Sequence, residues 1–217
     1  MPIANRSETT TRPLRIAVVG SGISALSCAW LLARHHKVVV YEQADRLGGH
    51  TNTVDVQGPA GTTPVDTGFI VFNDATYPNL VAMFDHLGVA SRATDMSFAV
   101  SLDEGRFEYA APALFAQRRN AFRPRFWTML REILRFYRDA PAQLATLSDA
   151  SLTLGDYLKR EGFSEAFRDD HLLPMAAAIW SSPAHTLMDY PAESFIRFCG
   201  NHGLLKLTGR PVWRTVQ

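Results

Sequence analysis

Apolar runs and breaks alternate in the first part of the chain in the order strand, helix, strand. Residues 14–19 and 37–41 are largely apolar runs, typical of buried parallel strands. Between them we expect a tight turn over 20–24 and a helix over 25–35, which has no internal glycine or proline. The order predicts a βαβ unit with a right-handed crossover. Cys28 lies within the helix, where we expect a buried thiol that acts as a small hydrophobic group.

Extended segments follow this unit. Alternating residues predict strands over 51–57 and about 64–72, separated by a turn at 58–61. A helix is expected over 77–87 and should end at Gly88. Residues 97–109 alternate on both sides of an Asp-Glu-Gly turn, which predicts a β-hairpin.

Helical periodicity dominates from about Pro112 onward. A core-facing stripe is expected between 126 and 137, made of Phe126, Leu130, Ile133, Leu134 and Tyr137. Further helices are expected over 153–161, 164–180 and 192–201. The last segment, 206–217, is expected to be extended or looped. The apolar stretch 174–183 has two interpretations, a substrate-cavity lining or a core helix with a serine cap, and we favour the second.

Composition and charge limit the range of partners. The chain is 47% hydrophobic and 20% charged, which suits a globular protein with a core, and its net charge is only +1. The chain has no broad positive electrostatic field that would attract nucleic acid. The basic cluster at Arg118-Arg119 is interpreted as part of a solvent-exposed face. A membrane surface is left open as a partner without support. Two cysteines and scattered histidines give no metal-ligand spacing, so no metal is expected.

The uncharged stretch 16–33 could suggest an export signal or a short membrane anchor. It contains Gly20-Ser21-Gly22, which would sit poorly in a plain apolar helix, and a β-branched run and an acid follow it at once. We therefore interpret the stretch as part of a folded interior and expect a cytoplasmic location.

The glycine-rich turn carries the strongest chemical signal. Gly20-Ser21-Gly22-Ile23-Ser24-Ala25 has G-x-G-x-x-A spacing after a predicted strand and at the start of a helix, as in dinucleotide-binding proteins. Gly20 is expected to permit the turn because a side chain would clash there. Gly22 would leave room for a pyrophosphate, and Ala25 would let helix and strand pack closely. The alternative is a packing turn with no ligand.

Glu42 ends the second predicted strand, about 20 residues after the turn, as the fingerprint requires. A carboxylate there accepts hydrogen bonds from ribose hydroxyls and repels a 2′-phosphate, which argues against NADP. Arg46-Leu47-Gly48-Gly49 then forms an R-x-G-G pattern, in which glycines would let a loop close over the pyrophosphate. This loop favours FAD over NAD.

Residues 16–51, together with Val65-Asp66-Thr67-Gly68-Phe69, resemble the flavin-containing amine oxidase superfamily. That group includes monoamine oxidases, protoporphyrinogen oxidases and phytoene-type desaturases, and the similarity extends to bacterial FAD/NAD-binding proteins within it. The resemblance covers about the first 75 residues at the level of motifs and is looser beyond, so it indicates the cofactor rather than the substrate.

The resemblance implies a set of FAD-contacting residues, divided among the adenosine ribose, the pyrophosphate, the covering loop and the flavin ring. They are Gly20, Ser21, Gly22, Ile23, Ser24, Ala25, Glu42, Gln43, Arg46, Gly48, Gly49, His50, Gly68, Phe69 and Ile70. His50 stands where amine oxidases usually have arginine, and Phe69 where many have a second glycine. These departures affect the ring side of the site, and no catalytic residue is assigned.

The fold class expected is α/β, an incomplete Rossmann-type βαβ FAD-binding domain with a mainly helical substrate-type domain. The boundaries expected are a disordered lead-in over 1–13, the FAD-binding part over 14–96 and the substrate-domain part over 97–217. No third parallel strand with its own helix is evident after Glu42, so we expect an N-terminal fragment, or half of a split protein, that would leave apolar faces exposed.

The function implied is FAD-dependent hydride abstraction from a small apolar molecule, with the fragment alone inactive. Two alternatives stay open: a non-catalytic dinucleotide-binding scaffold or half of a split protein, and an NAD-dependent dehydrogenase. The expected partners are the substrate and a second polypeptide or missing C-terminal half.

Overall fold

The computed structural model describes residues 12–111, 113–144, 151–180 and 183–217. The chain forms two compact units, which we call the N-terminal unit, up to Ile70, and the C-terminal unit, from Val71 to Gln217. This division concerns compactness, and the functional boundary expected between residues 96 and 97 stays a prediction. No described helix is long and apolar enough to cross a membrane.

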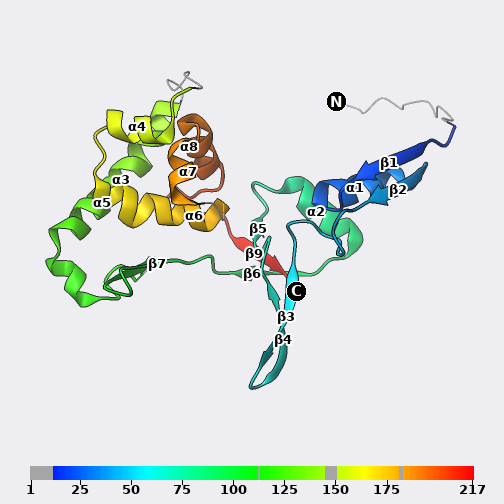
Figure 1. Ribbon diagram of the computed structural model, residues 1–217, viewed down its shortest axis with the longest axis horizontal. Coiled ribbons are helices and arrows are strands. Elements are labelled where there is room, and N and C mark those ends of the chain that lie inside the picture. The colour runs from blue at the N-terminus through cyan, green and yellow to red at the C-terminus, as the bar shows by residue number, and fades with distance from the viewer. Residues whose placement is uncertain (1–11, 112, 145–150, 181–182) are drawn as a thin grey trace. The chain divides into compact units, whose positions relative to one another are not determined.

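A βαβ motif opens the N-terminal unit, as predicted (Figure 1). Its elements are β1 (Arg15–Val19), α1 (Ile23–Leu32) and β2 (Lys37–Tyr41). The two strands pair in parallel with Arg15 opposite Lys37 and Val19 opposite Tyr41. The helix begins two residues earlier and ends three residues earlier than expected, because Gly22 is already its N-cap and Ala33 its C-cap.

The expectation that these strands and Cys28 are buried is wrong. Exposed positions alternate with half-buried ones along β1, Val19 is 84% exposed, and the Cys28 thiol is also exposed. The physical reason is the size of the sheet: β1 and β2 pair only with each other among the described strands. A two-stranded sheet with one helix cannot cover both apolar faces. The wide exposed apolar faces expected from the missing third strand are therefore present.

A β-hairpin completes the N-terminal unit. β3 (Thr53–Gly58) and β4 (Gly61–Asp66) are antiparallel, with Thr53 opposite Asp66. The turn between them lies at 58–61 as predicted, whereas the second strand begins at Gly61 and ends at Asp66 instead of running over about 64–72. The side chains of Asn52 and Thr67 hydrogen-bond at 2.8 Å and close the open end of this hairpin.

A three-stranded sheet and a helix begin the C-terminal unit. The strand order is β5–β9–β6, all antiparallel, with β9 in the middle. The elements are β5 (Phe72–Asn73), α2 (Pro78–Leu87), β6 (Ser91–Thr94) and β9 (Trp213–Val216). Gly88 ends α2 with φ +68°, as the sequence predicted. The last segment, expected to be extended or looped, thus supplies the central strand.

A hairpin packs on the start of the long helix. β7 (Phe98–Leu102) and β8 (Phe107–Ala111) confirm the predicted hairpin, and the Asp-Glu-Gly turn has positive φ at all three residues. The 3₁₀ turn η1 (Arg118–Phe122) leads into α3 (Pro124–Gln143). A small core unites the two, formed by Val100, Phe107, Tyr109, Phe126, Met129 and Ala166.

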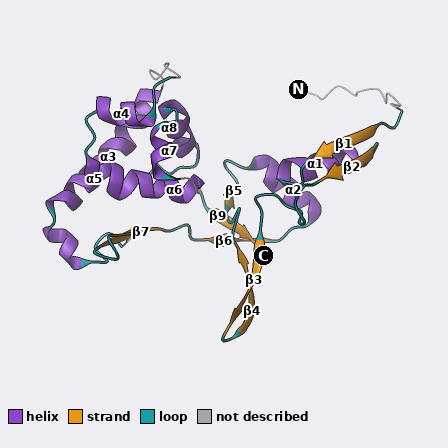
Figure 2. Ribbon diagram, in the orientation of Figure 1, coloured by secondary structure: helices purple, strands orange, loops and turns teal. Residues whose placement is uncertain are grey.

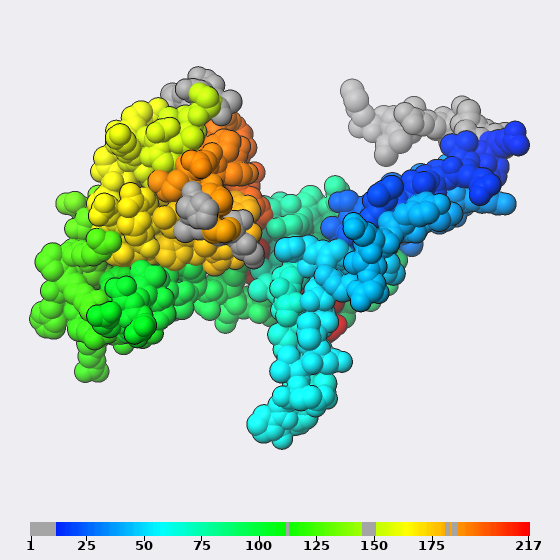
Figure 3. All heavy atoms as spheres, viewed as in Figure 1, coloured from blue at the N-terminus to red at the C-terminus, as the bar shows by residue number. Residues whose placement is uncertain are grey.

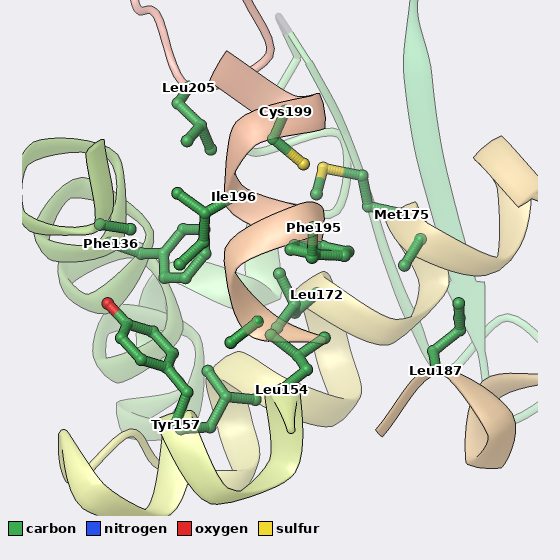
Figure 4. Close-up of a cluster of buried hydrophobic side chains, with 14 of the residues drawn as sticks. Phe136, Leu154, Tyr157, Leu172, Met175, Leu187, Phe195, Ile196, Cys199 and Leu205 are labelled. Atoms are coloured by element: carbon green, nitrogen blue, oxygen red, sulfur yellow. The ribbon is translucent and has the colours of Figure 1, made fainter. Parts of the chain in front are cut away.

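The main core lies among the remaining helices, which Figure 2 shows gathered around α3. They are α4 (Leu154–Arg160), α5 (Glu165–Phe167), α6 (Leu173–Trp180), α7 (Ala184–Met188) and α8 (Ala192–Asn201). Figure 4 shows Phe136 of α3, Tyr157 of α4, and Phe195 and Ile196 of α8 pointing into one cluster, each at most 1% exposed. Met175 and Ala176 of α6 belong to this core, which favours the core-helix interpretation of 174–183; the expected serine cap lies outside the described residues.

Two helical expectations need correction. The segment 164–180 is not one regular α-helix, because the π-helical turn η3 (Arg168–Leu172) joins α5 to α6. On α3 the core-facing positions are Phe126, Met129, Glu132, Phe136 and Ala140, whereas Leu134 of the expected stripe is 52% exposed. Glu132 occupies the core face because its carboxylate accepts hydrogen bonds from the Ser164 amide and hydroxyl, at 2.9 and 2.7 Å.

Phe126 and Phe122 provide a matched test of the small core. Phe126 is fully buried and meets the rings of Phe107 and Tyr109, whereas Phe122 is 88% exposed. Phe126→Ala should lower the free energy of unfolding by about 3–5 kcal/mol, because it removes a buried ring and leaves a cavity. Phe122→Ala should change it by about 0.5 kcal/mol or less. Urea denaturation measures both, and equal effects would contradict the packing described.

Candidate dinucleotide-binding site

The start of α1 leaves its amide groups available. Gly22 is the N-cap, and no described side chain caps the helix. The first turn, Ile23-Ser24-Ala25, carries no acid that could occupy the position of an anion. A Cβ added to Gly22 would meet no described atom within 4 Å. The helix N-terminus is therefore open, and its amides and dipole favour a negatively charged group.

Gly20 is required for a different reason from the one expected. A Cβ added there would also meet no described atom within 4 Å, so the expected clash is absent. Instead, Gly20 has φ +90°, a conformation that side chains disfavour. Its amide donates to the Tyr41 carbonyl oxygen at 2.7 Å, which ties the turn to the end of β2. Glycine thus allows a sharp turn that stays attached to the neighbouring strand.

Ser21 joins three parts of the site. Its side chain is fully buried, and its hydroxyl donates to the Oε2 atom of Glu42. The Gly48 amide donates to the Ser21 carbonyl oxygen at 3.0 Å and lies 3.3 Å from the hydroxyl oxygen. Sequence reasoning expected Ser21 to contact the cofactor; the structure places its side chain between the turn, the acid and the loop. No sequence signal marks this role, because the position is variable in the G-x-G pattern.

Glu42 is held in its ionised form. Its Oε1 atom accepts a hydrogen bond from the Ala44 amide at 2.9 Å. This bond, and next the Ser21 hydroxyl, lower the pKa of Glu42 from its ordinary 4.5 to about 2. An ionised carboxylate only accepts hydrogen bonds, and each oxygen keeps a further lone pair for a hydroxyl donor. The half-buried Glu42 is thus suited to hold two ribose hydroxyls.

The loop after Glu42 is closed by Arg46. Its guanidinium donates to the carbonyl oxygens of Thr51, at 3.0 Å, and Gly49, at 2.8 Å. Gly49 lies against the α1 turn, since a Cβ added to it would be 2.9 Å from the Gly22 Cα atom. Both Gly48 and Gly49 have positive φ, +106° and +59°. The two glycines therefore let the loop pass close to the open helix start.

The residues expected beside the flavin ring begin at Gly68, which lies against the backbone of His50. A Cβ added to Gly68 would be 1.8 Å from the His50 carbonyl oxygen, so only glycine fits where the two segments meet. Phe69 and Ile70 follow directly and are 37% and 50% exposed. The structure thus brings Gly68 and His50 together, next to the loop that Arg46 holds. Gln43 is exposed at the strand end.

These residues fit a dinucleotide cofactor. For FAD, the cofactor that the resemblance implies, each group of residues would hold a different part. Gly22, Ile23, Ser24 and Ala25 would hold the pyrophosphate, while Glu42 would hold the adenosine ribose. Gly48 and Gly49 would cover the phosphates, and Gly68 and Phe69 would lie toward the flavin. A bound flavin would supply the redox chemistry by accepting a hydride, and the protein would orient it and exclude water.

A second polar cluster lies in the C-terminal unit. The Tyr109 hydroxyl lies 2.9 Å from the Nδ1 atom of buried His171 and donates to the Asp170 carbonyl oxygen, while Asp170 pairs with Arg125 at 2.7 Å. Burial lowers the pKa of His171 to about 4, so the ring is neutral. Its Nε2 atom has no hydrogen-bond partner among the described residues. No described group of three or more acidic, histidine or cysteine side chains could hold a metal.

The N-terminal part of the chain is similar in sequence to known dinucleotide-binding proteins. A family described as NAD(P)-binding Rossmann-like domain matches residues 18–87. L-amino acid oxidase of Cerastes cerastes is 40% identical over 50 residues, which are 23% of this chain and 10% of that protein. The 15-cis-phytoene desaturase of Synechococcus elongatus is 37% identical over 81 residues, 36% of this chain and 16% of that protein.

The resemblance to the flavin-containing amine oxidase superfamily is confirmed for the N-terminal region. Solved structures extend the likeness of fold to most of the chain. Cyclohexylamine oxidase from Brevibacterium oxydans has a TM-score of 0.59 at 19% identity, over 94% of this chain and 45% of that one. A putrescine oxidase variant has a TM-score of 0.60 at 20% identity, over 94% and 46%. The chain therefore spans less than half the length of these relatives.

The expected fold class is confirmed by these similarities: a Rossmann-type βαβ motif with a mainly helical remainder. The likeness to the solved structures is one of fold alone at these identities. The roles of the individual cofactor-contacting residues stay predictions.

The ionisation of Glu42 can be followed by NMR. Its side-chain carboxyl should titrate with a midpoint near 2, and Ser21→Ala should raise the midpoint because one hydroxyl donor is lost. Because the folded pKa lies below 4.5, the carboxylate stabilises the fold above pH 4.5. This contribution is lost as the pH falls from 4.5 through about 2.

Ser27→Ala is the matched control, since the Ser27 hydroxyl donates to the Ile23 carbonyl oxygen within α1. It should leave the Glu42 midpoint unchanged. A wild-type midpoint near 4.5 would contradict the hydrogen bonds from Ala44 and Ser21.

Proposed function

We propose that the protein is an FAD-dependent oxidoreductase in which the N-terminal unit binds the adenosine diphosphate part of the cofactor. The observation that carries the proposal is the open start of α1 beside an ionised Glu42. An adenosine diphosphate group needs amides that bind its phosphates and a carboxylate that accepts hydrogen bonds from its ribose hydroxyls. Ser21 joins these two parts of the site.

The choice of FAD over NAD is supported by the loop and by the relatives. Arg46, Gly48 and Gly49 form a closed loop against the α1 turn. The matched relatives include proteins named as amino acid oxidases and a phytoene desaturase. We further propose that a small apolar molecule is oxidised by hydride transfer to the flavin. The rest of a longer chain, or a second polypeptide, would complete the substrate side.

Binding of FAD is tested by titrating the chain with FAD, NAD⁺ and NADP⁺, with flavin fluorescence and calorimetry as readouts. FAD should bind tightest, and NADP⁺ weakest because its 2′-phosphate meets the Glu42 carboxylate. Glu42→Gln should weaken FAD binding by ~10–100-fold, since hydrogen bonds to a charged acceptor contribute about 1.5–3 kcal/mol. As a further check, Glu42→Gln should lower the affinity for NADP⁺ less than it lowers the affinity for FAD.

Asp55→Asn is the control for that substitution, because Asp55 is an exposed carboxylate on β3 of the same unit. It should bind FAD as the wild type does. Binding of NAD⁺ that is as tight as FAD would favour an NAD-dependent dehydrogenase. Absence of any dinucleotide binding, together with a folded N-terminal unit, would contradict the proposal.

Gly22→Ala separates folding from binding. Gly22 has an ordinary φ of −69°, and the added methyl group would meet no described atom. Thermal unfolding of the free chain should therefore stay at the wild-type midpoint. FAD affinity should fall by at least ~10-fold, because the methyl group occupies the approach of the pyrophosphate.

Gly200→Ala in α8 is the matched control, since an added methyl group there also meets no described atom within 4 Å. It should affect neither FAD binding nor the unfolding midpoint adversely. Wild-type FAD affinity in Gly22→Ala would place the cofactor elsewhere.

A further inference from the structure

The outer side of α3 combines apolar and cationic residues on a single stripe. Trp127, Arg131, Leu134 and Arg138 follow one another at helical spacings of four, three and four residues. Trp127 and Leu134 are 50% and 52% exposed, and the Arg138 side chain is 75% exposed. A single exposed apolar side chain is ordinary, but two large ones on one stripe with arginines give a surface that is both apolar and cationic.

The stripe continues onto the turn before α3. Phe122 is 88% exposed, the largest value among the exposed apolar side chains of the described residues. The Trp127 indole N–H donates to the Ala121 carbonyl oxygen at 2.9 Å, and the Trp127 ring lies 5.7 Å from that of Phe115. These contacts fix the position of the indole beside the turn. We call Phe122, Trp127, Arg131, Leu134 and Arg138 the α3 outer face.

Positive charge is concentrated in the same stretch. Residues 113–139 contain seven arginines against the two acids Glu132 and Asp139, a net charge of +5 in a chain whose total is +1. Glu132 is buried and engaged by Ser164, and Asp139 pairs with Arg138 at 2.6 Å. Figure 3 shows this green part of the chain at the surface of the C-terminal unit. Arg125 also pairs with Asp170, which lies outside this stretch and offsets one of the charges. The remaining excess of arginines makes the surface around the α3 outer face cationic.

A hollow of about 570 Å³ lies along the stripe. Arginines dominate its lining, which consists of Arg131, Glu132, Leu134, Arg135, Arg138 and Gly162. Arg135 is held in place, because its guanidinium donates to the Glu161 and Gly162 carbonyl oxygens, both at 3.1 Å, and lies 3.9 Å from the Phe163 ring centroid. A volume of this size with guanidinium groups at its wall suits a phosphate-bearing headgroup.

We propose that the α3 outer face docks on an anionic lipid bilayer, with lipid phosphates in the arginine-lined hollow. Phe122, Trp127 and Leu134 enter the interfacial region of the bilayer, where aromatic and aliphatic side chains are favoured beside arginines. A soluble polyanion would match the charge but not the exposed apolar side chains. The bilayer surface matches both. The proposal concerns the C-terminal unit and does not rest on cofactor binding.

Co-sedimentation of the chain with vesicles tests the docking. Vesicles of phosphatidylcholine with phosphatidylglycerol should bind it at least ~10-fold tighter than vesicles of phosphatidylcholine alone. Shortening the Debye length to about 3 Å with 1 M salt should remove most of this preference. Brominated lipids should quench tryptophan fluorescence in the wild type and much less in Trp127→Phe.

Two double variants separate the contribution of the arginines to vesicle binding from that of the apolar side chains. Arg131→Glu with Arg138→Glu should abolish the preference for anionic vesicles. Phe122→Ser with Leu134→Ser should weaken binding at least ~10-fold, because two large apolar side chains no longer leave water. The control is Lys206→Glu with Leu207→Ser, an exposed basic and apolar pair at another place in the same unit, which should bind vesicles as the wild type does.

Three results would overturn the proposal. The first is wild-type co-sedimentation with anionic vesicles no greater than with neutral ones. The second is heparin binding that needs the arginines, without any loss of vesicle binding in Phe122→Ser with Leu134→Ser. The third is a dimer in sedimentation velocity that Leu134→Ser dissociates, which would assign the α3 outer face to a second copy of the chain. Unchanged circular dichroism of each variant verifies that the folded chain is being compared.

Discussion

The buried hydroxyl of Ser21 holds the candidate cofactor site together. It donates to Glu42 and lies beside the Gly48 amide, so the glycine turn, the acid at the end of β2 and the covering loop share one hydrogen-bonded centre. A fully buried hydroxyl without these partners would be costly. The position of the carboxylate relative to the start of α1 therefore depends on this small side chain.

The glycines around this centre act through different constraints. Gly20 and Gly48 are needed for backbone conformations that side chains disfavour, while Gly68 is needed because the His50 carbonyl oxygen approaches it closely. Gly22 has neither constraint within the described chain, and its lack of a side chain leaves space over the helix start. Space that the protein does not fill, next to anion-binding amides, is what a ligand site requires. The same distinction explains why the proposed function relies on Gly22 more than on its neighbours.

Local signals made much of the fold predictable. The βαβ motif, both hairpins and the ends of α2 and α8 depend on turn residues and periodicity, which act over a few residues. The burial of individual residues was less predictable, because it depends on which other elements pack against the strand or helix that carries them. Cys28 and β1 are exposed since their sheet has two strands. On α3, Glu132 lies on the core face because its carboxylate accepts hydrogen bonds from Ser164, whereas Leu134 faces outward. The pairing of β9 between β5 and β6 joins segments far apart in sequence, which no local pattern indicates.

The candidate site was predictable to a similar extent. The residue types at the turn, at Glu42 and in the loop indicated a dinucleotide, and the structure brings them together. Ser21 links the site through the Glu42 carboxylate and the Gly48 amide, and Arg46 closes the loop through backbone carbonyl oxygens. Residue identity does not encode these partners. The most direct test of the account is the amide NMR spectrum of the chain with and without FAD. We predict that the amides of Gly22, Ile23, Ser24 and Ala25 shift together on saturation. Unchanged amides at the start of α1, with shifts elsewhere or none, would contradict it.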